Sequence, residues 1–176
     1  MTLKEEREKK VKRLQRNLKN IRKIAGWSMQ QLADQIGVSK QTVSNWENEN
    51  NPTPMNFTQY IAIRAVIDCE VKENKNELLG EVVTLLLDTS EGLNEEEYKK
   101  LKKQLDIFFA TSGGLTLGYF LETVGPTLGA LKVSGVTSTI LGAAATASLG
   151  PLGIIGGAAA ITSGLWLKEL LKKKKK

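Results

Sequence analysis

The chain of 176 residues contains no histidine, a single cysteine and few aromatic side chains. The lack of histidine excludes histidine base catalysis and histidine metal sites. Cys69 alone can form neither an intrachain disulfide nor a multi-cysteine zinc site, which fits a reducing cytoplasm. Its apolar neighbours predict that Cys69 fills part of the core. Because no nucleophile–base pair, phosphate loop or cofactor fingerprint is present, we expect a protein that is not an enzyme and uses no metal or cofactor.

Positive charge is concentrated at the two ends of the chain, although the net charge is only +6. Residues 1–26 hold ten Lys or Arg against three acids, and residues 113–176 hold seven against two. Acids outnumber bases by five to two in residues 27–70 and by nine to six in residues 71–112. Basic ends suit a polyanion, either nucleic acid or anionic lipid, while the simpler explanation is solvated charge that aids solubility.

The apolar spacing predicts an all-α protein, since no segment shows the alternation of a strand. Thr2 and Glu5 can form a capping box for a first helix, which we expect to end at Gly26. Ser28 and Ser39 are the expected N-caps of two short helices. Further helices are expected over residues 55–68, 76–88 and 94–110.

Residues 28–47 have the spacing of two short helices joined by a tight turn. Gly37 can take the positive φ that such a turn demands, and Ala33 is small enough to let the helices cross closely. Val43 and Trp46 are expected to face the core. The opposite face of this second helix is polar and rich in hydrogen-bonding groups. It carries Lys40, Gln41, Thr42, Ser44 and Asn45.

The stretch SMQQLADQIGVSKQTVSNWENENNPTP resembles the helix-turn-helix of the XRE family, the phage-repressor and Cro class. The resemblance covers about residues 14–67 and implies a five-helix domain that binds double-stranded DNA. It implies that helix 39–47 enters the major groove and that its polar side chains contact base edges. The chemistry agrees, because glutamine and asparagine can pair with adenine and lysine can donate to guanine. The simpler alternative is a solvated helix face.

The resemblance also implies roles outside that face. Arg22 and Glu47 match a family ion pair that joins the first helix to the third. Met29 stands where many relatives have a phosphate-binding glutamine, and methionine cannot donate a hydrogen bond. Because Glu47 and Glu49 are expected to repel phosphate, the phosphate contacts must come from other residues. The candidates are Lys9, Lys10, Lys12, Arg13, Gln30, Ser39 and Asn48.

Composition divides the chain into five parts. These are a basic arm or helix extension (1–13), the helix-turn-helix domain (14–70), a helical connector or dimerisation region (71–112), a Gly/Ala-rich apolar helical region (113–167) and a lysine-rich tail (168–176). The connector has two apolar stripes, which form either a small core or the surface of a homodimer. The stripes are Leu79, Val82, Val83 and Leu86, and Leu101, Leu105, Phe108 and Phe109.

The apolar region is uncharged from residue 133 to residue 167, a run long enough to cross a membrane. We expect residues 133–167 to form a helical hairpin rather than one long span, either inserted in a membrane or folded as a soluble hairpin whose glycines let the two arms pack closely. A flexible tail is a third interpretation. Gly150 and Pro151 predict a turn, because proline cannot continue a helix.

From the helix-turn-helix resemblance we expect a cytoplasmic, sequence-specific transcriptional regulator, most simply a repressor. The alternative is a membrane-acting effector of a defence or toxin-like kind, which contacts membrane or anionic lipid through residues 113–176 and uses the helix-turn-helix as a sensor or autoregulator.

Overall fold

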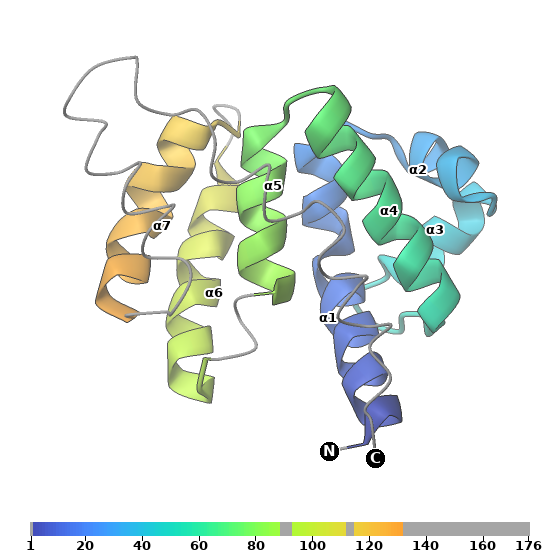
Figure 1. Cartoon of the computed structure of the whole chain (residues 1–176), viewed down its shortest axis with the longest axis horizontal. Coiled ribbons are helices and arrows are strands. Elements are labelled where there is room, and N and C mark those ends of the chain that lie inside the picture. The colour runs from blue at the N-terminus through green and yellow to red at the C-terminus, as the bar shows by residue number, and fades with distance from the viewer. Residues whose placement is uncertain (1, 89–92, 112–114, 132–176) are drawn as a thin grey trace. The chain divides into compact units, whose positions relative to one another are not determined.

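The computed structural model of the chain describes residues 2–88, 93–111 and 115–131. Every element in these residues is a helix, which confirms the predicted all-α fold (Figure 1). The elements are α1 (Leu3–Ile24), α2 (Met29–Ile36), α3 (Lys40–Trp46), α4 (Phe57–Glu73), α5 (Glu77–Val83), the π-helix η1 (Thr84–Asp88), α6 (Glu95–Ala110) and α7 (Leu117–Leu131). Two compact units make up the chain, Met1–Leu79 and Gly80–Lys176.

Side-chain caps fix where the first three helices begin. The capping box predicted for Thr2 and Glu5 is present in both directions, and so is a second box between Ser28 and Gln31. Ser39 caps α3 by accepting a hydrogen bond from the backbone of the first turn. Each cap satisfies a backbone N–H that has no partner inside its own helix. The helix starts are therefore set by local chemistry.

Gly37 makes the turn between α2 and α3. Its φ of 70° lies in the left-handed region, where a side chain would be strained. The following N–H, that of Val38, donates to the carbonyl of Ala33 at 3.0 Å and closes the end of α2. Ala33 is fully buried, so its small side chain lies where the helices approach. This turn is what directs α3 away from α2 with one face outward.

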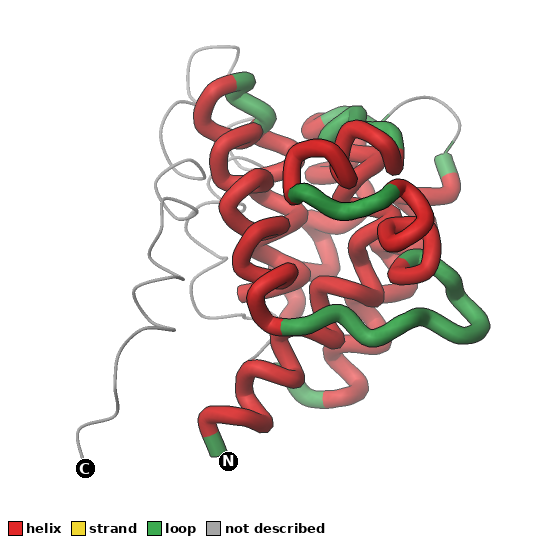
Figure 2. The backbone as a smooth tube through the Cα atoms, turned by 90° about the vertical axis from the view of Figure 1, so that its right-hand side faces the viewer, coloured by secondary structure: helices red, strands yellow, loops and turns green. Residues whose placement is uncertain are grey.

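The core of the first unit lies where α1 packs on α4 and where α2 packs on α3 and α4. Steps of three and four residues bring the apolar side chains of α1 to one face, as the spacing predicts. The buried apolar side chains of these helices include Val11, Leu14, Leu18, Ile21, Leu32, Val43, Trp46, Ile63 and Ile67. Residues 47–56 form the loop that joins α3 to α4, one of the green segments in Figure 2.

Helix α4 departs from the sequence-based expectation. Arg64 and Asp68 are both buried, although charged side chains are seldom found there. They are four residues apart and so share one face of the helix.

The prediction that Cys69 fills the core is wrong, because its side chain is exposed. At 100° per residue, Cys69 points about 200° away from the buried Ile67.

In the second unit, α6 packs against α7. The rings of Phe108 and Phe120 meet edge to face at 5.3 Å between centroids, and the Thr111 hydroxyl donates to the Tyr119 hydroxyl at 2.8 Å. The connector side chains that we assigned to a core or a dimer surface are buried, apart from the half-buried Phe109. Their burial within the chain fits a core.

The helix expected over residues 76–88 is divided in two. α5 begins after Asn76, whose Oδ1 accepts from the N–H of Leu79 at 3.1 Å and whose Nδ2 donates to the carbonyl of Ile24 at 3.3 Å. It then continues as η1, where the hydrogen bonds span five residues and Leu85, Leu86 and Leu87 are all buried. A π-helical turn widens the helix and lets three successive leucines turn inward, which an α-helical period does not predict.

Two predictions concern residues outside this description. One is the turn at Gly150 and Pro151, and the other is the choice between a membrane segment, a soluble hairpin and a flexible tail for residues 133–167. All of these residues lie beyond residue 131. Among the helices that are described, none is both long enough and apolar enough to cross a membrane. α7, the described part of the Gly/Ala-rich region, contains Pro126 within its 15 residues.

Candidate nucleic-acid interface

The polar face of α3 is directed outward. Lys40, Gln41 and Asn45 are exposed, while Thr42 and Ser44 are half-buried. On the opposite face, Val43 and Trp46 are 0 % and 2 % exposed and anchor the helix in the core. The hydrogen-bonding groups of α3 are therefore held by a fixed backbone rather than by a mobile loop.

Gln41 and Asn45 form a hydrogen-bonded pair on this face. Gln41 Nε2 donates to Asn45 Oδ1 at 2.8 Å, as their spacing of one helical turn allows. This arrangement leaves the Gln41 carbonyl as an acceptor and the Asn45 amide as a donor. Adenine presents one donor, N6, and one acceptor, N7, in the major groove. The pair thus has the complementary groups for an adenine edge.

Four of the residues predicted to contact phosphate lie on α1. Lys9 and Lys12 are exposed, and Lys10 and Arg13 are half-buried. α1 is helical without interruption from Leu3, so these side chains are positioned by a helix. Their spacing places cationic groups at intervals along the N-terminal half of α1, where they can meet a line of phosphates.

The three other predicted phosphate contacts already make hydrogen bonds within the chain. Gln30 Nε2 donates to Asp34 at 2.7 Å. The Ser39 hydroxyl accepts from the N–H of Thr42 at 3.0 Å and lies 2.9 Å from its hydroxyl. Asn48 Oδ1 accepts from two backbone amides of the turn that follows. Ser39 therefore acts first as a helix cap, whereas the amide group of Asn48 keeps its donors.

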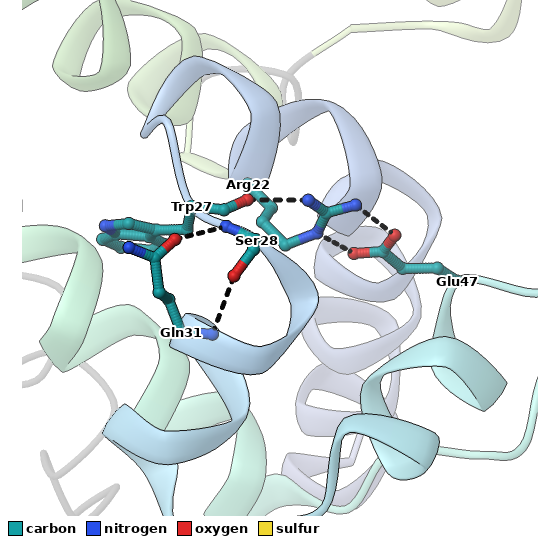
Figure 3. A network of polar contacts seen from close by, with 5 residues as sticks. All are labelled: Arg22, Trp27, Ser28, Gln31 and Glu47. Atoms are coloured by element: carbon teal, nitrogen blue, oxygen red, sulfur yellow. Dashed lines mark hydrogen bonds and ion pairs between the residues drawn. The ribbon is translucent and has the colours of Figure 1, made fainter.

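Arg22 and Glu47, paired by the resemblance, are in contact (Figure 3). Arg22 Nε and Nη2 donate to the two oxygens of Glu47 at 2.7 and 2.9 Å, and Nη1 donates to the Trp27 carbonyl at 2.7 Å. The hydrogen bonds that Arg22 donates to the Glu47 carboxylate raise the pKa of Arg22. Only 11 % of the Arg22 side chain and 2 % of the Glu47 side chain are exposed. One guanidinium thus joins α1, the turn after it and the end of α3.

The expectation that Glu47 and Glu49 repel phosphate needs correction. The carboxylate of Glu47 is neutralised by Arg22 and nearly buried. Glu49 is exposed, and its carboxylate lies 2.7 Å from Lys19 Nζ. The hydrogen bond from Lys19 is the main cause that lowers the pKa of Glu49, so the carboxylate is ionised but paired. Both charges at the end of α3 are compensated by α1, which reduces their repulsion of DNA.

Sequence reasoning missed Gln15, which ties α1 to the loop after α3. Its Nε2 donates to the carbonyls of Thr53 at 2.7 Å and Trp46 at 3.3 Å, and its Oε1 accepts from the N–H of Met55 at 3.1 Å. The only signal in the sequence is one polar residue directly after the apolar Leu14. Gln15 fixes the path of the loop that follows the candidate DNA-reading helix.

Replacing Gln15 by Ala should lower the free energy of unfolding by about 1–3 kcal/mol, because it leaves part-buried backbone groups without partners. Denaturant unfolding of the two proteins measures the difference. Gln35→Ala, which removes an exposed glutamine from α2, is the matched control and should change stability by less than about 0.5 kcal/mol. Equal losses in the two variants would show that the contacts of Gln15 do not stabilise the loop.

Comparison with known families agrees with this geometry. Residues 18–61 match a family model described as helix-turn-helix, which confirms an XRE-like helix-turn-helix in this part of the chain. The matched segment contains α2, α3 and the Arg22–Glu47 pair, whereas the basic residues Lys9 to Arg13 precede it. Searches of curated proteins and of solved structures found no match.

Proposed function

We propose that the chain is a transcriptional repressor that binds double-stranded DNA in a sequence-specific manner and reads the major groove with α3. The helix-turn-helix match supports a DNA-binding regulator in general. The observation that carries the proposal is the outward polar face of α3 on a helix anchored by Val43, Trp46 and the Arg22–Glu47 pair. A repressor of this kind acts by occupying its site and excluding the transcription machinery.

The proposed interface divides positioning from reading. The cationic side chains of α1 contact phosphates and set the register of the protein on the duplex, while α3 contacts base edges. α3 itself supplies only one cation, Lys40, and its C-terminal end is flanked by the paired Glu47. Affinity in this proposal therefore comes mostly from α1, and specificity comes mostly from Gln41 and Asn45.

Selection from a random library of DNA duplexes tests the proposal. The full chain should enrich one sequence motif, and a gel shift should show tighter binding to that motif than to a scrambled duplex. A palindrome with half-sites about one helical turn apart would identify the bound species as a two-fold dimer. Failure to enrich any motif, or equal binding to motif and scramble, would contradict a sequence-specific regulator.

Gln41→Ala and Asn45→Ala should each cost about 1–3 kcal/mol of binding to the enriched motif and little on scrambled DNA. Because the two side chains are hydrogen-bonded to each other, the losses should not add, and the double variant should show a coupling of about 0.5 kcal/mol or more. Gel-shift titrations measure all three variants. Gln104→Ala on α6 is the control and should bind like the unchanged chain. Equal losses on motif and scramble would show that neither residue reads bases.

A further inference from the structure

A groove of about 640 Å³ opens in the first unit between the N-terminal half of α1 and the start of α4. Its lining does not include any residue of α2 or α3. The apolar part of the lining consists of Leu3, Val11, Pro54, Met55 and Phe57. Among them Leu3 is 46 % exposed and can therefore meet a ligand. The volume lies within the range of sites for small molecules, about 300–1,000 Å³.

Cationic side chains border this apolar surface. Lys4, Arg7 and Lys12 line the groove together with one acid, Glu8, so the formal charge of the lining is three positive against one negative. The nearest contact between Lys4 Nζ and Glu8 is 4.0 Å, and both side chains are exposed, so their attraction is weak. The groove therefore favours a ligand with a negative group over a neutral or cationic one.

Among the cationic side chains of the groove, Arg7 lies directly over its apolar surface. Its guanidinium carbon lies 4.8 Å from the centroid of the Phe57 ring, over the apolar surface. Its Nε atom is buried and lacks a hydrogen-bond partner among the described residues. The terminal nitrogens of a guanidinium can hold a carboxylate by two parallel hydrogen bonds. The guanidinium of Arg7 thus provides a position for a negative group next to Phe57.

We propose that the groove binds a long-chain carboxylate, a fatty acid or a molecule of the same chemistry. The alkyl chain lies on the apolar surface, and the carboxylate binds Arg7, with Lys4 and Lys12 adding long-range attraction. A long alkyl chain matches the apolar lining of the groove, and a single carboxylate matches the positive charge of its lining. The site is separate from α3, and its occupation does not depend on the chain being a repressor.

Calorimetric titration of the full chain with laurate, below the concentration at which laurate forms micelles, tests the proposal. Binding should be saturable at one laurate per chain. Affinity should rise about fourfold for each methylene added from octanoate to laurate, as burial of the alkyl chain predicts. Dodecyltrimethylammonium, which has the same tail and the opposite charge, should bind at least about tenfold more weakly. Equal affinity for the two head groups would overturn the proposal.

Methionine methyl NMR locates the ligand. The chain has three methionines, of which Met55 lines the groove and Met29 lies in α2. Laurate should shift the Met55 signal and leave that of Met29 unchanged. A shift of Met29 alone, or uniform small shifts of all signals, would place laurate elsewhere and overturn the assignment.

Two variants with a matched control complete the test. Arg7→Gln should weaken laurate binding by about tenfold or more, and Leu3→Ser, at an exposed position that the core does not need, should weaken it several-fold. Lys9→Gln removes an equal charge from α1 outside the groove and should have little effect. If laurate does not bind and the groove variants instead turn a dimer into a monomer in ultracentrifugation, the groove is a surface between two copies, and the proposal is wrong.

Discussion

Glu47→Ala should lower the free energy of unfolding by roughly 3–5 kcal/mol, since it leaves a mostly buried guanidinium without its carboxylate. Two of the three hydrogen bonds that Arg22 donates go to Glu47. The remaining bond, to the Trp27 carbonyl, cannot compensate the charge. For a domain of this size the loss corresponds to a fall in Tm of about 10 °C or more. The variant should also bind DNA less well, because the end of α3 loses its link to α1.

Glu49→Ala is the matched control for this prediction. It removes the same type of charge two residues away, from a side chain that is 76 % exposed. Exposed ion pairs contribute little, so the change in stability should stay within about 0.5 kcal/mol. Thermal and denaturant unfolding of both variants measure the difference. Similar melting of the two would show that the Arg22–Glu47 pair does not stabilise the fold in solution.

Replacing Lys9, Lys10, Lys12 and Arg13 together by glutamine should flatten the plot of log affinity against log salt concentration. Each phosphate contact that is lost reduces the slope by about 0.9, so four contacts change it by about 3.6. The affinity for motif and scrambled DNA should fall together, because phosphate contacts carry no sequence information. Gel shifts over a range of salt concentrations provide the slopes.

The control variant neutralises four lysines of α6 and so removes the same total charge from the second unit. These lysines are Lys99, Lys100, Lys102 and Lys103. Since all four are exposed on a helix outside the matched segment, the salt slope should change by much less than in the α1 variant. Equal changes in the two variants would mean that only net charge matters and that α1 does not contact DNA.

Features set by residues close in sequence could be predicted. The capping box at Thr2, the cap at Ser28, the turn at Gly37 and the outward face of α3 all depend on neighbours within one or two turns of helix. The buried face of α1 could likewise be predicted, because the periodicity of its apolar residues is a local pattern. Even the hydrogen bond between Gln41 and Asn45, which we did not predict, has the spacing of a helical neighbour pair.

Features that depend on distant residues could not be predicted in the same way. Gln15 contacts groups 31 to 40 residues away, and the Lys19–Glu49 pair spans 30 residues. Neither contact leaves a periodic trace in the sequence. The Arg22–Glu47 pair was expected only because the helix-turn-helix resemblance implied it. The burial of Arg64 likewise depends on the packing around α4, which the spacing of charged residues does not reveal.

Substitution of single purines by 7-deazapurines in the selected duplex tests most directly whether α3 reads the major groove. The change removes N7, an acceptor that purines present only in the major groove, and leaves base pairing intact. We predict that binding by the full chain weakens at a few clustered purines, and that Gln41→Ala and Asn45→Ala each abolish the effect at one or more of them. Binding that is insensitive to every such substitution would contradict major-groove reading by α3.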